Sequence, residues 1–133
     1  MMANQNRVRQ GEANRAWGQY CEQIAAEYFI KAGYTVRERN WRLNKIEIDL
    51  ILEKDRTIVF VEVKARDGVH HDPILAVDDK KQRKMVNAAD IYLRQLSHLY
   101  QYRFDIFGVA GNMEEFKTYH YPDAFIPKVN GGR

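Results

Sequence analysis

Residues 46–66 read IEIDLILEKDRTIVFVEVKAR, a stretch that predicts two apolar strands joined by a turn over residues 54–57. Each strand carries a carboxylate in its interior, Asp49 in the first and Glu62 in the second. A buried carboxylate without a partner either incurs a large desolvation penalty or becomes protonated. The two acids therefore imply a compensating cation, which could be Lys64, a metal ion or both.

The alternation of side chains predicts how these two strands pair. With the turn at residues 54–57, Asp49 falls opposite Glu62 and Glu47 falls opposite Lys64, and aliphatic side chains face aliphatic ones. This register gathers the charged side chains on one face, at the end of the hairpin remote from the turn. The other face of the first strand is expected to be wholly apolar and comprises Ile46, Ile48, Leu50 and Leu52.

Two carboxylates directly opposite one another, with Cβ atoms about 5 Å apart, repel and destabilise a sheet. A divalent ion between Asp49 and Glu62 would reverse that effect, and Mg²⁺ and Mn²⁺ are hard cations that prefer oxygen ligands. Lys64 would then lie beside the ion, where it can stabilise developing negative charge or hold an attacking water. The alternative is a ladder of cross-strand ion pairs, with Glu47 paired to Lys64. That ladder accounts less well for three acids and one base on a single face.

The overall composition is that of one globular domain. The chain has 133 residues, of which 45% are hydrophobic and 29% charged, and its formal net charge is +3. No apolar run approaches the length of a membrane span. The single cysteine, Cys21, excludes an internal disulfide and a cysteine-rich zinc site, as expected for a cytoplasmic protein. We expect a flexible N-terminal arm over residues 1–14, a single domain over 15–127 and a C-terminal tail over 128–133.

Apolar residues at helical spacing predict a helix on each side of the strand region. The first covers residues 14–32 and is ended by Gly33. The second begins at Asp78 or Asp79 and runs to about His98. The buried stripe expected for the first helix is Trp17, Cys21, Ile24, Ala25 and Tyr28. The stripe expected for the second is Met85, Ala89, Tyr92, Leu96 and Leu99.

Further strands are expected at residues 34–41, 104–109 and 116–121. The resulting order is a helix, three strands, a helix and one or two strands. This order predicts an α/β fold in which helices flank a mixed sheet and the acids lie at one edge.

Basic residues crowd the start of the second predicted helix; they are Lys80, Lys81, Arg83 and Lys84. Cations near a helix N-terminus oppose the helix dipole, so helix stability does not explain them. Phosphate binding does, because the dipole, the free amides and the side-chain charges then attract the same anion. A solvated basic face is an equally simple explanation of this segment taken alone.

Asp49, twelve intervening residues and then Glu62-Val63-Lys64 resemble the divided active-site motif of the PD-(D/E)xK nuclease superfamily. From about Gly18 to Phe125 the chain is also similar to the YraN-like family of small bacterial proteins, a group similar to archaeal Holliday junction resolvases. The residues that carry this similarity are Gly18, Glu22, Ala25, Tyr28, Gly33, Tyr34, Arg39, Asn40, Glu47 to Ile51, Phe60 to Lys64, Arg66, Lys81 to Arg83, Arg103 to Asp105, Ala124 and Phe125. The chain departs from the family pattern at Cys21 and Ile46, where the family usually has glycine.

The resemblance implies a restriction-endonuclease-like αβββαβ core and a role for each acid of the motif. It implies that Asp49 and Glu62 bind Mg²⁺ or Mn²⁺ and that Lys64 assists the nucleophilic water. Glu22 is implied to be an additional acid near the metal. Two weaker candidates for the same site are Glu47 and Lys81.

This interpretation predicts a cytoplasmic, metal-dependent endonuclease that hydrolyses phosphodiester bonds of DNA, with branched or damaged DNA as candidate substrates. Arg66 and the basic residues of the second helix are expected to hold the phosphates. A homodimer would suit a junction-like substrate, whose symmetry is two-fold. Two alternatives stay open: a nucleic-acid-binding protein without catalysis, and a structural protein whose strand charges form an ion-pair ladder.

Overall fold

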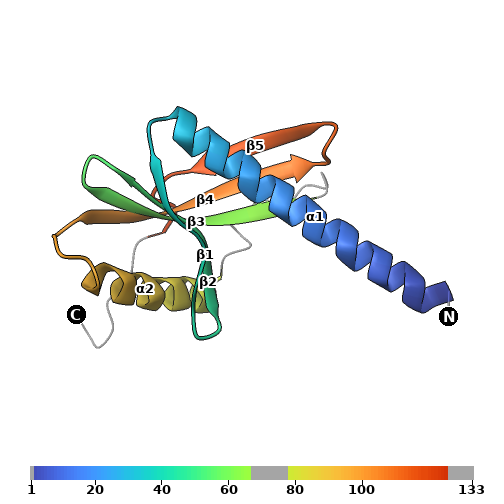
Figure 1. The fold of residues 1–133 in the computed structure, drawn as a ribbon, viewed down its shortest axis with the longest axis horizontal. Helices are drawn as coiled ribbons and strands as arrows, with labels where there is room; N and C mark the ends of the chain where they lie inside the picture. Colours follow the sequence, from blue (N-terminus) through green and yellow to red (C-terminus); the bar gives the residue numbers. More distant parts are fainter. Residues whose placement is uncertain (1, 67–77, 126–133) are drawn as a thin grey trace.

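The computed structural model describes residues 2–66 and 78–125, which form a five-stranded sheet with a helix on each face (Figure 1). The elements are α1 (Met2–Lys31), β1 (Thr35–Leu43), β2 (Ile46–Lys54), β3 (Thr57–Arg66), α2 (Asp79–Arg94), β4 (Gln101–Gly111) and β5 (Phe116–Tyr121). The strands lie in chain order, and all neighbours are antiparallel except β3 and β4, which are parallel. The predicted α/β fold with a mixed sheet and an αβββαβ core is confirmed, and β5 is an antiparallel edge strand beyond that core.

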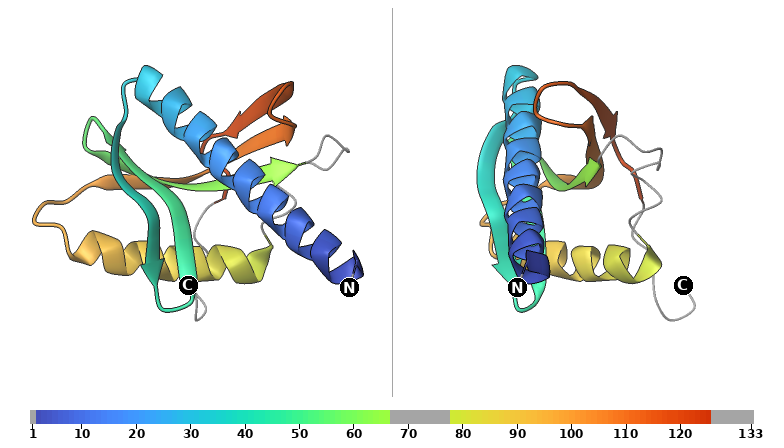
Figure 2. Two further views of the ribbon diagram at one scale, coloured as in Figure 1. Left: turned by 45° about the vertical axis from the view of Figure 1, so that its right-hand side comes forward. Right: turned by 90° about the vertical axis from the view of Figure 1, so that its right-hand side faces the viewer.

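Alternate side chains of the sheet pack against the two helices, which cross opposite faces (Figure 2). The cluster under α1 comprises Cys21, Ala25, Ala26 and Phe29 of the helix and Leu50, Leu52, Val59, Val61, Phe107 and Val109 of the sheet. The cluster under α2 comprises Met85, Ala88, Ala89 and Tyr92 of the helix with Ile48, Ile51, Ile58, Phe60, Phe104, Ile106 and Phe125. Burial of these apolar side chains is the main force that holds both helices to the sheet.

The hairpin of β2 and β3 has the predicted register. Its pairs run from Lys54–Thr57 to Leu50–Val61. The turn consists of Asp55 and Arg56, whose φ angles of 51° and 61° are both positive, as a tight two-residue hairpin turn requires. Beyond Leu50 the ladder stops, and the amide of Val63 donates to Oδ2 of Asp49 at 2.8 Å.

The prediction of a wholly apolar face on β2 is wrong. Ile46 and Ile48 pack in the cluster under α2, whereas Leu50 and Leu52 lie under α1. The side chains before and after Asp49 therefore do not follow one regular alternation, and Asp49 lies just before the part of β2 that pairs with β3. The Asp49 carboxylate consequently lies between the two strands, bonded to a backbone amide, instead of standing above the sheet.

Helix α1 begins at Met2 and not at the predicted residue 14, so it includes residues 2–14, which the composition suggested to be a flexible arm. Its first turns extend beyond the sheet (Figures 1 and 2). A local hydrogen bond between Gln10 and Asn14, at 3.0 Å, supports this exposed part. Polar composition alone misleads here because a helix can continue into solvent from a buried half that is already formed. The predicted C-terminal tail lies outside the described residues.

Helix α1 ends at Lys31, and Gly33 forms its C-terminal cap as predicted. The amide of Gly33 donates to Ile30, the amide of Tyr34 donates to Phe29, and Gly33 has a φ of 95°. This is a Schellman motif, which favours glycine because L side chains are strained at positive φ. Phe29, and not the predicted Tyr28, is the buried aromatic residue; Tyr28 is 40% exposed.

Helix α2 starts where predicted and ends earlier. Asp78 is the N-cap, and its carboxylate accepts from the amide of Lys81 at 2.9 Å. The helix stops at Arg94 instead of His98, so the predicted burial of Leu99 is wrong; Leu99 is 94% exposed. After Arg94 the chain turns toward β4.

Candidate metal centre and nucleic-acid interface

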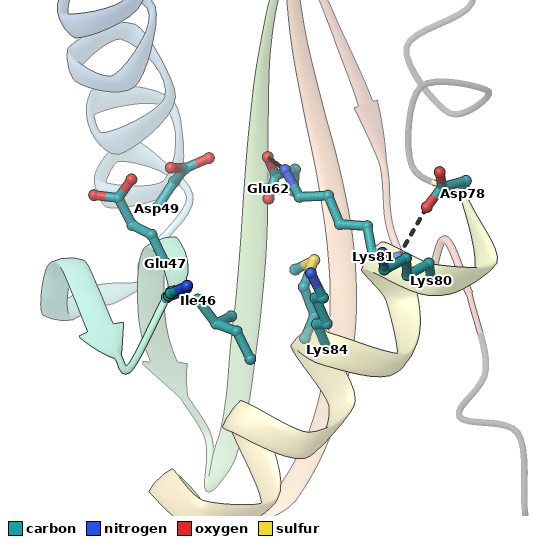
Figure 3. Close-up of a pocket in the computed structure, with 10 residues that line it drawn as sticks. Ile46, Glu47, Asp49, Glu62, Asp78, Lys80, Lys81 and Lys84 are labelled. Carbon is teal, nitrogen blue, oxygen red and sulfur yellow. Dashed lines mark hydrogen bonds and ion pairs between the residues drawn. The ribbon is translucent and has the colours of Figure 1, made fainter.

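Four acidic side chains influence one another where β2 and β3 separate. This carboxylate cluster comprises Glu22 of α1, Glu47 and Asp49 of β2, and Glu62 of β3. In Figure 3 Glu47 and Asp49 project from β2, and Glu62 projects from β3 beneath the side chain of Lys81. The structure therefore brings together all four acids that the sequence analysis singled out.

Asp49 is the most perturbed member of the carboxylate cluster. Burial raises the pKa of Asp49 to about 8, with the charge of Glu62 adding to the effect and the hydrogen bond from Val63 opposing it. Smaller contributions in the raising direction come from Glu22 and Glu47. An acid in this environment is destabilised in its charged form, so it will gain from any cation placed beside it.

Glu62 is 5% exposed and has two unequal oxygens. Oε1 lies 2.8 Å from Nζ of Lys81 and 3.6 Å from Nζ of Lys64. Oε2 is buried and has no hydrogen-bond partner among the residues that the structure describes. Native proteins rarely leave a buried carboxylate oxygen unpartnered, so Oε2 marks a place for a ligand that the chain itself does not supply.

Glu22 reaches the carboxylate cluster from the opposite face of the sheet. Burial raises the pKa of Glu22, a hydrogen bond with Asn40 opposes this, and the charges of Glu47 and Glu62 add to it. A second hollow next to Glu22 is lined by Arg15, Gly18, Gln19, Asn40, Arg42 and Glu47. Because Glu47 lines this hollow and the main pocket, the carboxylate cluster is open from two sides.

The expected pairing of Glu47 with Lys64 does not form. Glu47 lies 3.5 Å from Nε of Arg42, and Lys64 instead approaches Glu62. The hairpin ladder does not reach this pair, because β2 pairs with β3 only over Leu50–Lys54 and residues 46–49 lie apart from β3. A regular cross-strand ion-pair ladder therefore does not describe this end of the hairpin.

The two lysines at Glu62 differ in charge behaviour. Burial lowers the pKa of Lys64; Glu62 opposes that shift, and the neighbouring Lys81 and Arg66 add to it. For Lys81 burial also acts to lower the pKa, but the hydrogen bond and charge of Glu62 outweigh it and the pKa is raised. The charged form of Lys81 is thus favoured beside Glu62, whereas the charged form of Lys64 is disfavoured.

A pocket opens between the carboxylate cluster and the start of α2 (Figure 3). Its lining comprises Lys45, Ile46, Glu47, Asp49, Glu62, Asp78, Lys80, Lys81, Lys84 and Met85. Three of the four basic helix residues expected to bind phosphate line it, and the exposed Arg83 does not. The sequence analysis missed Lys45, which belongs to no recognisable motif. It lines the pocket because it lies in the turn between β1 and β2.

Arg66 lies at the end of β3. Its Nε is buried and lacks a hydrogen-bond partner within residues 2–66 and 78–125, while Nη1 donates to the Ala65 carbonyl at 3.3 Å. The indole Nε1 of Trp17 donates to the Arg66 carbonyl at 3.3 Å, which fixes the strand end under α1.

The donor set fits a hard divalent cation. Asp49 and Glu62 offer carboxylate oxygens, Oε2 of Glu62 is unpartnered, and Mg²⁺ usually takes one or two carboxylates with water and substrate phosphate. Among the described residues, no group of three or more His, Cys, Asp or Glu side chains is placed to hold a metal. Asp49 and Glu62 could therefore offer two carboxylate ligands here, with water or substrate completing the coordination of a bound ion.

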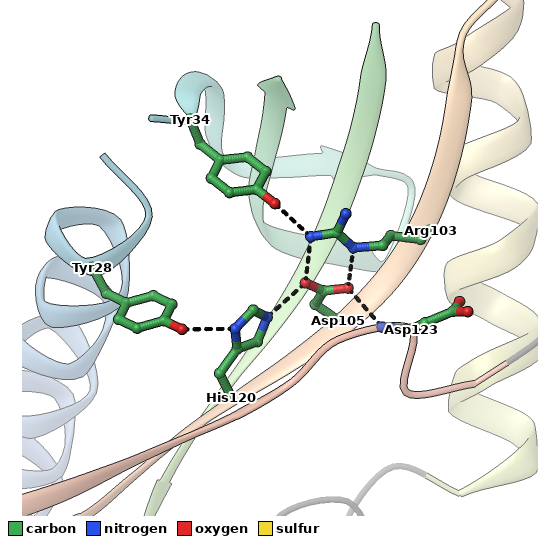
Figure 4. A network of polar contacts seen from close by, with 6 residues as sticks. All are labelled: Tyr28, Tyr34, Arg103, Asp105, His120 and Asp123. Carbon is green, nitrogen blue, oxygen red and sulfur yellow. Dashed lines mark hydrogen bonds and ion pairs between the residues drawn. The ribbon is translucent and has the colours of Figure 1, made fainter. Parts of the chain in front are cut away.

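A second polar network lies around Asp105 of β4 and was not predicted. Asp105 is fully buried and accepts from Nε and Nη2 of Arg103 at 2.9 and 3.2 Å and from the amide of Asp123 at 2.9 Å. Nε2 of His120 is 2.7 Å away, and Tyr28 reaches Nδ1 of His120 at 2.9 Å (Figure 4). The network joins α1, β4 and β5, and both oxygens of the Asp105 carboxylate have hydrogen-bond partners within the described residues, so we interpret it as structural.

Residues 21–109 match the model of the uncharacterised protein family UPF0102. The chain belongs to this family. UPF0102 proteins of Phocaeicola vulgatus, Syntrophotalea carbinolica and Caldanaerobacter subterraneus subsp. tengcongensis are 37%, 40% and 42% identical to it. The matches cover 85%, 81% and 81% of this chain and 94%, 89% and 93% of those proteins. The YraN-like resemblance is thereby confirmed, and the UPF0102 match spans the whole carboxylate cluster.

Membership of UPF0102 assigns no activity, since the family is described as uncharacterised. Within the described residues, neither helix has the length and apolar content needed to cross a membrane. The chemistry of the carboxylate cluster and its pocket is therefore what bears on function.

Proposed function

We propose that this UPF0102 protein is a Mg²⁺- or Mn²⁺-dependent endonuclease that hydrolyses DNA phosphodiester bonds, with Asp49 and Glu62 as the metal ligands. The observation that carries the proposal is the buried, unpartnered Oε2 of Glu62 in a pocket shared with Asp49 and lined by lysines. A cation would neutralise the carboxylates of the pocket, and an anion would neutralise its lysines. A divalent ion with a phosphate diester supplies both.

Some side chains of the pocket would act at the metal and others would hold the phosphates. Val63 orients the Asp49 carboxylate through its amide, and Lys64 lies close enough to Glu62 to stabilise charge on an attacking water. Lys80 and Lys84 line the pocket wall formed by α2, where they would hold flanking phosphates. A bound Mg²⁺ or Mn²⁺ would supply Lewis acidity and a water of lowered pKa.

Branched or damaged DNA is the substrate class that we propose to test first, in a cytoplasmic protein that acts as a homodimer on two-fold junctions. A protein that only binds DNA is the competing function. It would bind with an affinity that falls steeply with salt, and it would cut no strand with any divalent ion.

The test is a cleavage panel of duplex, single-stranded, flap and four-way DNA with Mg²⁺ or Mn²⁺. We expect wild-type protein to cut at least one substrate, and Asp49→Asn and Glu62→Gln to reduce the rate by more than about 100-fold, because each removes a ligand. Asp90→Asn, an exposed acid on the far part of α2, is the control and should cut normally.

Circular dichroism of each variant checks that the fold is retained. Cleavage that persists undiminished in both Asp49→Asn and Glu62→Gln would contradict the proposal. Salt-sensitive binding by wild-type protein without cleavage of any substrate would favour the non-catalytic alternative.

A further inference from the structure

One ammonium group already occupies a cation position at the carboxylate cluster. Nζ of Lys81 lies 2.8 Å from Oε1 of Glu62, a distance typical of a charge-assisted hydrogen bond. The Lys81 side chain is 40% exposed while that of Glu62 is 6% exposed. Lys81 thus reaches inward from the rim of the pocket to neutralise a buried acid, as Figure 3 shows.

The fold fixes the position of the Lys81 backbone. Asp78 caps α2 by accepting from the Lys81 amide at 2.9 Å, so the backbone at Lys81 is anchored at the first turn of the helix. Its side chain is more exposed than that of Lys64, at 40% against 17%. The other lysine at this acid, Lys64, is 3.6 Å from Oε1 of Glu62, beyond normal hydrogen-bond distance, and comes from the same strand. Lys81 is therefore the movable member of the pair.

We infer that Lys81 is a built-in competitor of the metal: its ammonium holds Oε1 of Glu62, and its charge opposes a divalent ion at Oε2 of the same carboxylate. The inference rests on the proposed function, since it takes Glu62 as a metal ligand. Two positive groups at one carboxylate repel each other strongly in a poorly solvated site. The ion pair that stabilises the carboxylate cluster without metal therefore opposes metal binding.

The geometry makes Lys81 distinct from the other lysines of the pocket. Lys84 lines the same pocket from the next turn of α2, but no ion pair joins it to an acid among the residues described. Both side chains carry the same charge and come from the same helix. Lys81 is half-buried against Glu62 and Lys84 is exposed, so Lys84 is a control for removal of one positive charge from the same helix.

The experiment measures Mn²⁺ affinity by electron paramagnetic resonance of the free ion, with full-length protein and no DNA. We expect Lys81→Met to bind Mn²⁺ about tenfold more tightly than wild type, because the competing ammonium is gone. Lys84→Met should change the affinity by less than about threefold, because its charge acts only from a distance. Lys81→Arg, which keeps a cation, should resemble wild type.

The outcomes separate this inference from the proposed function. Equal Mn²⁺ affinity of wild type and Lys81→Met, or equal effects of Lys81→Met and Lys84→Met, overturns the competitor role and leaves the metal site intact. Mn²⁺ binding by none of the proteins overturns both. If Lys81→Met does not fold, the comparison of Lys81→Gln with Lys84→Gln decides in the same way.

Discussion

Asp49→Asn is expected to raise the stability of the metal-free protein by about 2–4 kcal/mol near pH 8. Burial and the charge of Glu62 raise the pKa of Asp49 to about 8, so its ionised form is disfavoured in the folded state. Asparagine carries no charge, and its side-chain oxygen can still accept from the amide of Val63. For a domain of this size the gain corresponds to roughly 5–15 °C in Tm.

The pH dependence gives this prediction its sign. The folded-state pKa of Asp49 lies above the ordinary value of 3.8, so wild-type protein loses stability as the pH rises from about 4 to about 8. The Asp49→Asn variant lacks that loss. The difference between the two proteins should be small at pH 4, grow with pH and become constant above about pH 8.

The measurement is thermal unfolding in EDTA from pH 4 to pH 9. Glu47→Gln is the control, because Glu47 belongs to the same carboxylate cluster and is only partly buried, so its gain should be smaller. A wild-type protein that is more stable than Asp49→Asn at pH 8 without metal would contradict the prediction that ionised Asp49 destabilises the folded state. Saturating Mg²⁺ should narrow or reverse the difference, because only the wild type retains both proposed ligands.

The second large effect is a loss of about 3–5 kcal/mol on Asp105→Asn. The Asp105 carboxylate is fully buried and takes hydrogen bonds from Arg103, from the amide of Asp123 and from His120. Neutralising it leaves the Arg103 guanidinium, whose side chain is 26% exposed, without its buried counter-charge. The substitution should also loosen β5, because His120 ties that edge strand to Tyr28 of α1.

Urea unfolding of Asp105→Asn beside Asp90→Asn tests the difference between a buried and an exposed ion pair. Asp90 pairs with Arg94 at 2.7 Å, but its side chain is 55% exposed, and we expect a loss below about 0.5 kcal/mol. Similar losses in the two variants would contradict the structural role of the Asp105 network.

Acid stability offers an independent check of the same network. Burial acts to raise the pKa of Asp105, but hydrogen bonds from His120, Arg103 and the Asp123 amide outweigh it, so the pKa is lowered. The contribution of Asp105 is therefore present above its ordinary value of 3.8 and is lost as the pH falls below that value. Wild-type protein should lose more stability below pH 4 than Asp105→Asn does.

The hairpin at the centre of the fold was predictable because its pattern is local. Alternating apolar residues and the short polar turn define one register, and the observed pairing from Lys54–Thr57 to Leu50–Val61 has it. The carboxylates near its end followed from the same register. The start of α2 and the end of α1 were also predictable, since Asp78 and Gly33 act through hydrogen bonds within a few residues.

The reversal of faces at Asp49 was not predictable from alternation. β2 stays paired with β1 as far as Ile46 but pairs with β3 only from Leu50 onward, and Ile46 and Ile48 pack with α2, which alternation along the chain does not reveal. The contacts of Lys81 with Glu62 and of Asp105 with His120 likewise join different elements. No spacing rule encodes them.

By itself, then, the sequence determined the order of helices and strands, the hairpin register and the residues that could carry metal chemistry, because each of these depends on neighbours along the chain. Tertiary structure alone decided that Asp49 lies between two strands, that Glu62 keeps one oxygen unpartnered and that Lys81 covers the other. Burial and charge at this site arise from the packing of α2 against the sheet, which brings distant residues within a few ångströms of one another.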